Sequence, residues 1–300
     1  MSARLRIERA GPLTTIQDKG RPGLLVHGIS ASGPMDAESY RRAGLLAGAR
    51  ADGAIEVTQA GLDLIVVEGS TQVGWEGGSF SVAINSEPKT WPGSALLNSG
   101  DRLTIKPGPL GNYGYLRFGG ALDLPQSMGS LATSTRARLG GVEGRSLRAG
   151  DELVLVGEGV APVVPLASGA GTGPIRFVWG IHAEQFSRDL RERFVHGSFR
   201  VTAAMDRMGV RLADLDNAFA GASILSLVSD PILPGDIQIL GDGTPIVLMR
   251  DHQPTGGYPR IGTVISADLD RFAQMRPGTE VAFSPVTVEH AHRLLRSKAK

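Results

Sequence analysis

The chain has 300 residues, which is enough for two domains of ordinary size, each with its own buried core. Its 31 lysines and arginines nearly balance its 30 aspartates and glutamates, and a net charge of +1 argues against nucleic acid or an anionic membrane as a partner. The absence of cysteine excludes disulfides, a thiolate nucleophile and zinc sites that need sulfur, and it fits a reducing compartment.

The first ten residues alternate charged and apolar side chains and lack the apolar stretch of a signal peptide. The longest apolar runs, residues 64–67 and 246–249, are far shorter than the roughly 18 residues typical of a membrane-spanning helix. The sequence therefore predicts a cytoplasmic protein without a membrane partner.

Short runs in which apolar and polar residues alternate occur along the whole chain, and this period of two is typical of half-buried strands. Three of the runs follow a glycine, Gly100, Gly150 or Gly278, that can adopt the positive φ of a tight turn. Short strands at regular turn spacing favour a closed barrel or a sandwich. The alternating positions are Phe80, Val82, Ile84, Leu103, Ile105, Leu153, Leu155, Ile175, Phe177, Trp179, Val281 and Phe283.

Helical patterns are few and short. Residues 36–46 begin with acidic side chains and stop near Gly48, and residues 184–194 place three large apolar side chains on one face. A third helix is predicted from an N-cap at Ser266 to residue 272, and a fourth over residues 287–296. So few helices among many strands predict a mainly β fold.

Residues 157–174 are rich in glycine, alanine and proline and carry no charge after Glu158, which is typical of a linker. We therefore expect an N-terminal β-rich domain over residues 1–160 and a C-terminal one over residues 172–300.

Polar, glycine-punctuated loops are the candidate sites. The first covers residues 14–23, where Gln17, Asp18 and Arg21 are candidate ligand-binding residues; the alternative is that Asp18 and Arg21 form an ion pair within the loop. A second, residues 133–145, combines hydroxyls, arginines and glycines, and fits either an anion-binding loop or a solvated basic turn.

The third candidate covers residues 205–212. Arg207 and Arg211 lie four positions apart, so in a helix they would converge on one anion. Asp206 is also placed to neutralise one of them.

The strongest candidate is residues 251–260, which separate two predicted strands at residues 246–249 and 263–265. A glycine pair alone would make this turn, so the additional polar side chains predict a ligand site. The alternative is that Asp251 and Arg260 pair with each other across the turn. The polar and glycine positions are Asp251, Gln253, Thr255, Gly256, Gly257, Tyr258 and Arg260.

Familiar catalytic motifs are missing. The 6 histidines show no metal-ligand spacing, so we expect no metal site. The chain also has no phosphate-binding loop, no nucleophile elbow and no Met-Lys-Met biotin attachment site. Catalysis by this chain alone is therefore unsupported.

Six segments carry a resemblance to a known family: GPLTTIQDKGRPG, SGPMD, RARLGGVEGR, MDRMGVRL, PGDIQI and DHQPTGGYPRIGTVISADL. In this order and over almost the whole chain they resemble the family variously called biotin-dependent carboxyltransferase, allophanate hydrolase subunit 2, KipA and the 5-oxoprolinase C subunit. The resemblance implies two tandem cyclophilin-like β-barrels with a few short helices.

It also implies the C subunit of an ATP-dependent 5-oxoprolinase, a lactam hydrolase that converts 5-oxoproline to glutamate and that we expect to be inactive as a single chain. The implied partners are a B subunit, which resembles KipI, and a separate lactam-opening subunit. ATP would bind at an unfamiliar site or on the partner. Two alternatives remain: a carboxyltransferase that moves a carboxyl group from carboxybiotin to urea or a related amide, and a KipA-like regulatory protein that binds a KipI-like partner.

Opening a lactam requires stabilisation of negative charge and transfer of protons. Within this resemblance we expect Asp18, Asp251 and Arg260 to be catalytic. The residues expected to bind a small polar substrate are Gln17, Arg21, Arg207, Arg211, Gln253, Thr255, Gly256, Gly257 and Tyr258.

Overall fold

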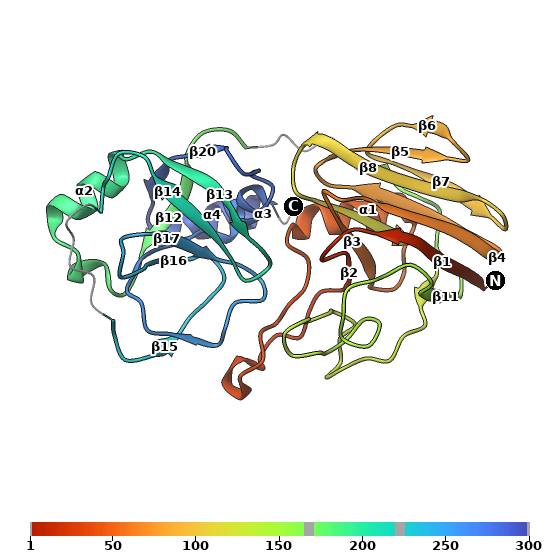
Figure 1. Ribbon diagram of the computed structural model, residues 1–300, viewed down its shortest axis with the longest axis horizontal. Helices are drawn as coiled ribbons and strands as arrows, with labels where there is room; N and C mark the ends of the chain where they lie inside the picture. Colours follow the sequence, from red (N-terminus) through yellow and green to blue (C-terminus); the bar gives the residue numbers. More distant parts are fainter. Residues whose placement is uncertain (1, 165–170, 220–225, 299–300) are drawn as a thin grey trace. The chain divides into compact units, whose positions relative to one another are not determined.

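The computed structural model describes residues 2–164, 171–219 and 226–298, and its chain forms two compact units (Figure 1). Unit 1 comprises Met1–Gly23 and Ala31–Ser168, and unit 2 comprises Leu24–Ser30 and Gly169–Lys300. Part of the predicted linker, residues 165–170, lies outside the described residues.

Unit 1 is organised around one long strand, β4 (Leu62–Glu76). Its first half pairs with β1 (Ala3–Ala10) and β8 (Arg102–Leu110), and its second half pairs with β7 (Gly93–Asn98) and β9 (Tyr113–Phe118). One strand thus joins two parts of an 11-stranded sheet. The other strands are β2 (Thr15–Gln17), β3 (Ala54–Thr58), β5 (Ser79–Ile84), β6 (Glu87–Lys89), β10 (Ala121–Leu122) and β11 (Glu152–Val156).

The core of unit 1 follows the period of two. Leu62, Leu64 and Val66 of β4 are fully buried, whereas the residues between them are partly exposed. Helix α1 (Ala37–Ala47) packs against the second half of this strand, where a Cβ on Gly74 would lie 2.4 Å from the backbone nitrogen of Ala47. A glycine is therefore needed there for the close approach of helix and sheet.

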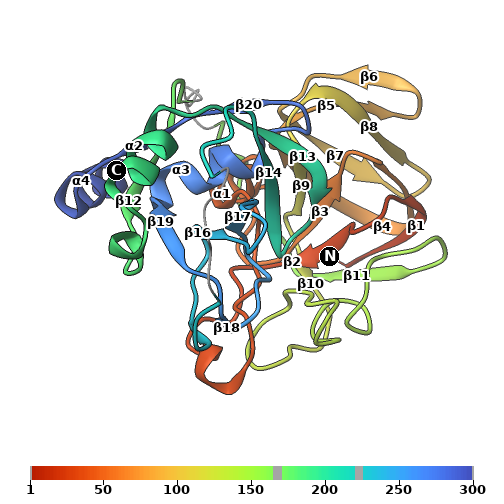
Figure 2. The same cartoon turned by 60° about the vertical axis from the view of Figure 1, so that its left-hand side comes forward.

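Unit 2 is a nearly closed barrel (Figure 2). Its strand order is β20-β13-β14-β17-β16-β19-β12-β21, and the two edge strands, β20 (Glu280–Val281) and β21 (Phe283–Pro285), are separated only by Ala282. The remaining strands are β12 (Ile175–Trp179), β13 (Phe199–Met205), β14 (Gly209–Asp214), β16 (Asp236–Ile239), β17 (Pro245–Leu248) and β19 (Arg260–Val264), with a separate pair formed by β15 (Asp230–Pro231) and β18 (Thr255–Gly256).

The barrel interior holds a cluster of aromatic rings. Phe194, from helix α2 (Arg188–His196), lies 5.3 Å from Phe177, 5.4 Å from Phe199 and 5.1 Å from Phe283, measured between ring centroids. Such contacts stabilise a core beyond the burial of apolar area. The other helices of unit 2 are α3 (Ser266–Ala273), α4 (Val288–Lys298) and the 3-10 turns η1 (Leu25–His27) and η2 (Ala183–Gln185).

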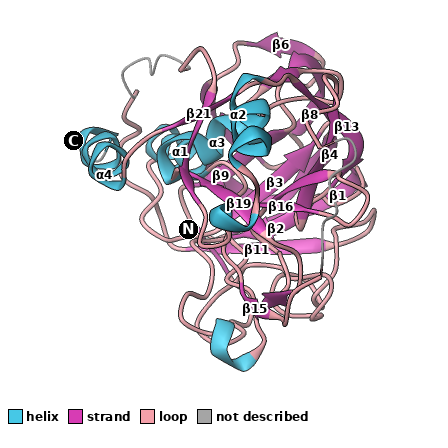
Figure 3. Cartoon of the chain, turned by 90° about the vertical axis from the view of Figure 1, so that its left-hand side faces the viewer, coloured by secondary structure: helices cyan, strands magenta, loops and turns pink. Residues whose placement is uncertain are grey.

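The structure confirms the predicted mainly β fold of two barrel-like units with a few short helices (Figure 3). The predicted helix over residues 184–194 is wrong in its extent, because Ser187 caps a new helix by accepting a hydrogen bond from the Leu190 amide. Ser266 is the first helical residue rather than the N-cap, which is Ile265. No helix in the described ranges has both the length and the apolar character needed to span a membrane.

Candidate functional site

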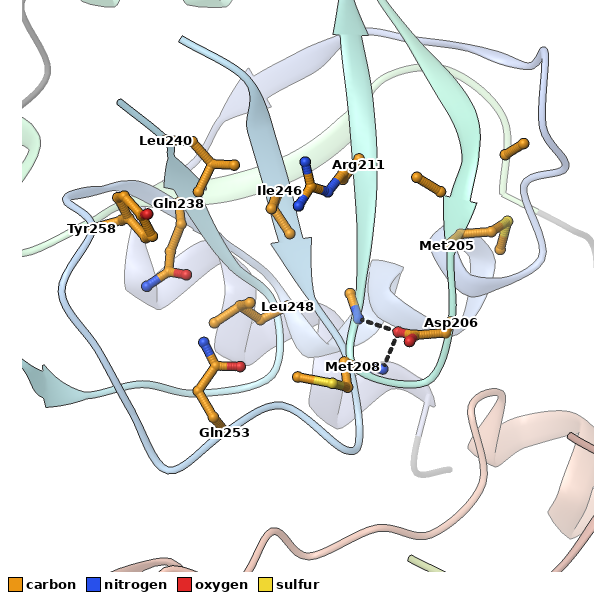
Figure 4. Close-up of a pocket in the computed structure, with 13 residues that line it drawn as sticks. Met205, Asp206, Met208, Arg211, Gln238, Leu240, Ile246, Leu248, Gln253 and Tyr258 are labelled. Carbon is orange, nitrogen blue, oxygen red and sulfur yellow. Dashed lines mark hydrogen bonds between the residues drawn. The ribbon is translucent and has the colours of Figure 1, made fainter. Parts of the chain in front are cut away.

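A pocket of about 520 Å³ lies on unit 2, on the face of its sheet that points away from the barrel interior (Figure 4). Its floor includes Arg211, Ile246 and Gln238, which are cross-strand neighbours on β14, β17 and β16. The adjacent residues Val210 and Val247 are buried and face the opposite side. The period of two thus gives one strand face to the core and the other to the pocket.

The pocket wall has an apolar and a polar part. The methionines come from the end of β13 and from the turn after it. The branched aliphatic side chains are Leu240, which follows β16, and Ile246 and Leu248 of β17. Polar groups enter from β14, from β16 and from residues 253–258. The lining side chains include Met205, Asp206, Met208, Arg211, Gln238, Leu240, Ile246, Leu248, Gln253 and Tyr258.

Residues 205–212 are not helical, so the condition under which Arg207 and Arg211 would converge on one anion is not met. The segment is a hairpin in which Met205 of β13 pairs with Val210 of β14, and Asp206 accepts hydrogen bonds from the amides of Met208 (2.7 Å) and Gly209 (3.2 Å). Asp206 therefore organises the turn. Arg211 is exposed and lines the pocket, whereas Arg207 is buried, so the two arginines do not converge as helix neighbours would.

Arg207 forms a buried ion pair with Asp251. Its Nε donates to one carboxylate oxygen at 2.8 Å and its Nη2 to the other at 3.2 Å, while the Asp251 amide donates to the Arg207 carbonyl at 2.7 Å. Both side chains are at most 7% exposed. A two-point contact of this kind has a fixed geometry, so it holds the 206–208 turn against the segment that begins at Asp251.

Arg260 is also held in a buried ion-pair cluster. Its Nη1 donates to the Pro231 carbonyl at 2.7 Å and to Asp236 at 3.3 Å, and its Nη2 donates to Asp230. The alternative that Asp251 and Arg260 pair with each other is therefore wrong. Neither residue lines the pocket, and both are held in ion pairs; their expected catalytic role stays a prediction.

Residues 253–258 form the edge of the pocket. Gln253 and Tyr258 line it, whereas Thr255 and Gly256 form β18 and pair with β15. Gly257 lies against backbone, because a Cβ there would be 2.9 Å from the Leu227 carbonyl oxygen. The strongest candidate loop thus contributes two side chains to the pocket.

Gln238 is a pocket residue outside the predicted set. It is 2% exposed, and its Nε2 has no hydrogen-bond partner among the described residues. A Cβ on Gly256 would lie 2.5 Å from this nitrogen, so the absence of a side chain at position 256 leaves room for the amide. The sequence signal, a glutamine between Ile237 and Ile239, is the ordinary alternation of a strand and did not by itself mark a site.

The candidate residues of unit 1 are hydrogen-bonded mainly to a second segment, residues 127–133. Gln17 donates to Thr15 and to the Thr133 carbonyl and accepts from the Gly33 amide. Asp18 accepts from Gly20, Ser130 and Leu131, and Arg21 donates to the carbonyls of Ser127 and Ala132. Gln17 and Arg21 are at most 2% exposed and Asp18 is 6% exposed, so these residues stabilise the loop.

Two histidines of unit 2 lie near the pocket segments. Burial lowers the pKa of His252, which is 3% exposed and whose Nδ1 lies 2.6 Å from the Gln253 carbonyl oxygen. Burial also lowers the pKa of His182, whose Nδ1 accepts a bond from the Arg260 amide at 3.3 Å. Both rings are thus favoured in the neutral state. The residues that the structure describes contain no cluster of side chains that could hold a metal ion.

A β-barrel with a small polar pocket and a full-length sequence match define the class of this protein. The model of the family described as "Carboxyltransferase domain, subdomain A and B" matches residues 27–285, and the chain belongs to this family. The chain is 36% identical to the 5-oxoprolinase C subunit of Escherichia coli, over 96% of this chain and 93% of that protein. It is 34% identical to the 5-oxoprolinase C subunit of Haemophilus influenzae, over 94% and 91% of the two chains. The resemblance drawn from the six sequence segments is confirmed.

Solved structures give the same fold. The crystal structure of the Kluyveromyces lactis urea carboxylase superposes with a TM-score of 0.89 at 25% identity. The match covers 99% of this chain and 28% of the urea carboxylase chain. The fold of this chain is therefore one part of that larger protein.

Proposed function

We propose that this chain is the C subunit of an ATP-dependent 5-oxoprolinase, which converts 5-oxoproline to glutamate together with partner subunits. The observation that supports this most is the match to the 5-oxoprolinase C subunit over more than nine-tenths of both chains. The urea amidolyase of Lachancea kluyveri, in contrast, is matched over 17% of its length. A full-length match favours a shared role as a separate subunit.

The pocket of unit 2 is suited to this substrate. 5-Oxoproline has a carboxylate, a lactam carbonyl and ring methylenes. Arg211 is an exposed cation in the pocket wall and would bind the carboxylate. Ile246 and Leu248 line the same pocket and would contact the methylenes. A volume of about 520 Å³ exceeds the need of one small lactam, which leaves space for a group supplied by a partner.

ATP would be supplied by the assembled complex. The sequence has no phosphate-binding loop, so we assign the nucleotide to a site formed with the B-subunit homologue or the lactam-opening subunit. The γ-phosphoryl group would pass to the lactam oxygen and release ADP; water would then add to the activated carbon. Loss of phosphate and cleavage of the C–N bond, with protonation of the amine, yield glutamate.

The test is reconstitution of the complex. We expect glutamate and ADP to form from 5-oxoproline and ATP only when this chain, a B-subunit homologue and the lactam-opening subunit are combined. Arg211→Gln should reduce kcat/KM roughly tenfold or more, because a charge-assisted contact to the carboxylate is lost. Arg200→Gln is the matched control, since Arg200 is an exposed arginine on the neighbouring β13 that pairs with Glu280. Turnover by the purified single chain would contradict the proposal.

The carboxyltransferase alternative is favoured by the family description and by the likeness to urea carboxylase. In that case carboxybiotin would be supplied in trans by a partner. Avidin separates the two functions, because it sequesters biotin. Turnover that avidin blocks, with carboxylation of urea or a related amide, would support the alternative; turnover of 5-oxoproline that avidin leaves unchanged supports the main proposal.

A further inference from the structure

We propose that Gln238 recognises the carbonyl oxygen of the ligand in the unit 2 pocket, and that Gly256 is kept free of a side chain so that the Gln238 amide can reach this oxygen. The inference rests on the proposed function for the choice of 5-oxoproline as the probe. It goes further by assigning the carbonyl end of the ligand to Gln238 and the anionic end to Arg211.

The first step is the state of the Gln238 amide. A primary amide is a strong donor, and a buried donor without an acceptor destabilises the folded protein. Gln238 is 2% exposed and lines the pocket, and its Nε2 finds no partner in the described part of the chain. This nitrogen is closed to solvent beside Gly256, so donation to a ligand requires the terminal amide to turn about its last side-chain bond. An apolar side chain of similar size would fill the position without this penalty. The glutamine is thus unfavourable for folding alone, as is common where a group serves a ligand.

The second step is a comparison with Gln17 of unit 1, which is also fully buried. Both ends of its amide are used: Nε2 donates at 2.9 Å and 3.1 Å, and Oε1 accepts at 3.1 Å. Gln17 thus has hydrogen-bond partners at both ends of its amide. Gln238 differs because its Nε2 has no partner among the described residues and because it lines a pocket.

The third step is the role of Gly256. Its backbone does not require glycine on conformational grounds, because it is absent from the residues with positive φ. A Cβ at this position would nevertheless lie 2.5 Å from the Gln238 Nε2 and 3.2 Å from the Ile232 Cδ1. The nearest obstacle is the flexible end of a side chain. Alanine would therefore displace the amide while leaving the backbone unstrained.

The fourth step is the spacing of the two polar ends. Gln238, Ile246 and Arg211 are neighbours across three adjacent strands, so the backbones of Gln238 and Arg211 are two strand spacings apart, roughly 10 Å. Between them lies the apolar Ile246. The geometry selects a small ligand with a carbonyl oxygen at one end, an anionic group at the other and an apolar ring between, and 5-oxoproline has this pattern.

The experiment measures binding of three probes to the full chain, alone and in the reconstituted complex, by calorimetry. 5-Oxoproline has both groups, 2-pyrrolidinone lacks the carboxylate, and proline lacks the lactam carbonyl. We expect 5-oxoproline to bind tightest. Gln238→Leu should weaken 5-oxoproline roughly tenfold or more and leave proline unchanged, whereas Arg211→Gln should weaken both carboxylates and leave 2-pyrrolidinone unchanged. Equal affinity of Gln238→Leu and the parent chain for 5-oxoproline would overturn the assignment.

Thermal unfolding without ligand tests the same point independently. Gln238→Leu should unfold at the same temperature as the parent chain or higher, because an unsatisfied donor is removed, and should lose the increase in Tm that 5-oxoproline produces. Gln17→Leu is the matched control and should lower Tm, since three bonds are broken. A marked decrease in Tm for Gln238→Leu would show a structural role and contradict the inference.

Gly256→Ala provides a variant that retains the Gln238 amide. We expect it to fold, and to bind 5-oxoproline as weakly as Gln238→Leu does. The double variant Gly256→Ala/Gln238→Leu should be no weaker than either single one, because both act on the same contact. Additive losses would overturn the pairing of the two residues. If binding follows these expectations but the complex does not hydrolyse 5-oxoproline, the recognition site stands and the proposed function fails.

Discussion

Two polar, glycine-rich regions of this chain look alike in sequence and differ in structure. In unit 1, Gln17, Asp18 and Arg21 hydrogen-bond to residues of their own loop and of residues 127–133. In unit 2, residues 206–208 and 251–258 are joined by one buried ion pair, Arg207 with Asp251, and surround a pocket. Similar polar composition thus leads in one unit to a loop bonded to a neighbouring segment and in the other to segments beside a pocket.

The largest effect is expected when the ion pair of unit 2 is broken. Arg207→Ala or Asp251→Ala leaves a buried charge without its partner and should reduce the free energy of unfolding by about 3–5 kcal/mol. Because both pocket segments are attached through this pair, ligand affinity should also fall. Chemical denaturation of each variant measures the loss.

The double variant Arg207→Leu/Asp251→Leu is the control, because it removes both charges together. It should lose less stability than either single variant. If either single variant loses less than about 1 kcal/mol of unfolding free energy, the Arg207–Asp251 pair contributes no more than an exposed ion pair does. The pair would then not be what holds the two pocket segments of unit 2 together.

The sequence predicted the strands better than the residues of the candidate site, because the two depend on contacts of different range along the chain. Alternation in residues such as Leu62, Leu64 and Val66 depends on near neighbours in the chain. Whether a polar group finds a hydrogen-bond partner depends on residues far away in the chain. Arg207 and Asp251 are 44 positions apart, and Arg21 and the Ala132 carbonyl are 111 positions apart. The sequence could locate polar loops, but the partners of each polar group became visible only in the fold.

A second effect is expected in unit 1. Asp18→Ala removes the acceptor of three donors, the Ser130 hydroxyl and the amides of Leu131 and Gly20, and should reduce the free energy of unfolding by about 3 kcal/mol. Binding of 5-oxoproline to the folded chain should be unchanged. Asp101→Ala is the control, because Asp101 is a turn acceptor for Asn98 that remains close to solvent, and it should lose less. Loss of ligand binding in folded Asp18→Ala would support this loop as a ligand site.

A third effect depends on pH and concerns Asp268, a carboxylate of unit 2 that does not line the pocket. Burial alone would raise the pKa of Asp268, but hydrogen bonds from Arg176 outweigh it and hold this pKa below its ordinary value of 3.8. The stabilisation is therefore complete above pH 3.8 and is lost as pH falls through the lower pKa of the folded state.

Asp268→Asn should accordingly be less stable than the parent chain at pH 7, by about 2 kcal/mol, the scale of charge-assisted hydrogen bonds. The difference should narrow as pH falls below about 4, because the parent chain then loses the same charge. Unfolding curves of both proteins at several pH values measure this. A difference that is constant with pH would show that the charge of Asp268 does not contribute.

The smallest effect on the folding and ligand binding of the two halves is expected when the chain is cut between them. We propose that residues 157–174 form the linker between the two domains; this stretch contains no lysine or arginine, so elastase, which cuts after small apolar residues, is the suitable protease. Its described ends are held locally, since the Val160 amide donates to the Gly48 carbonyl at 2.8 Å and Arg271 donates to the Gly173 carbonyl at 2.8 Å. Cleavage should therefore give two fragments of about half size.

The C-terminal fragment should keep its affinity for 5-oxoproline, because all residues that line the pocket lie after the cut. First cuts inside either half would place the boundary elsewhere, and loss of binding in an otherwise folded fragment would show that the pocket depends on the N-terminal half.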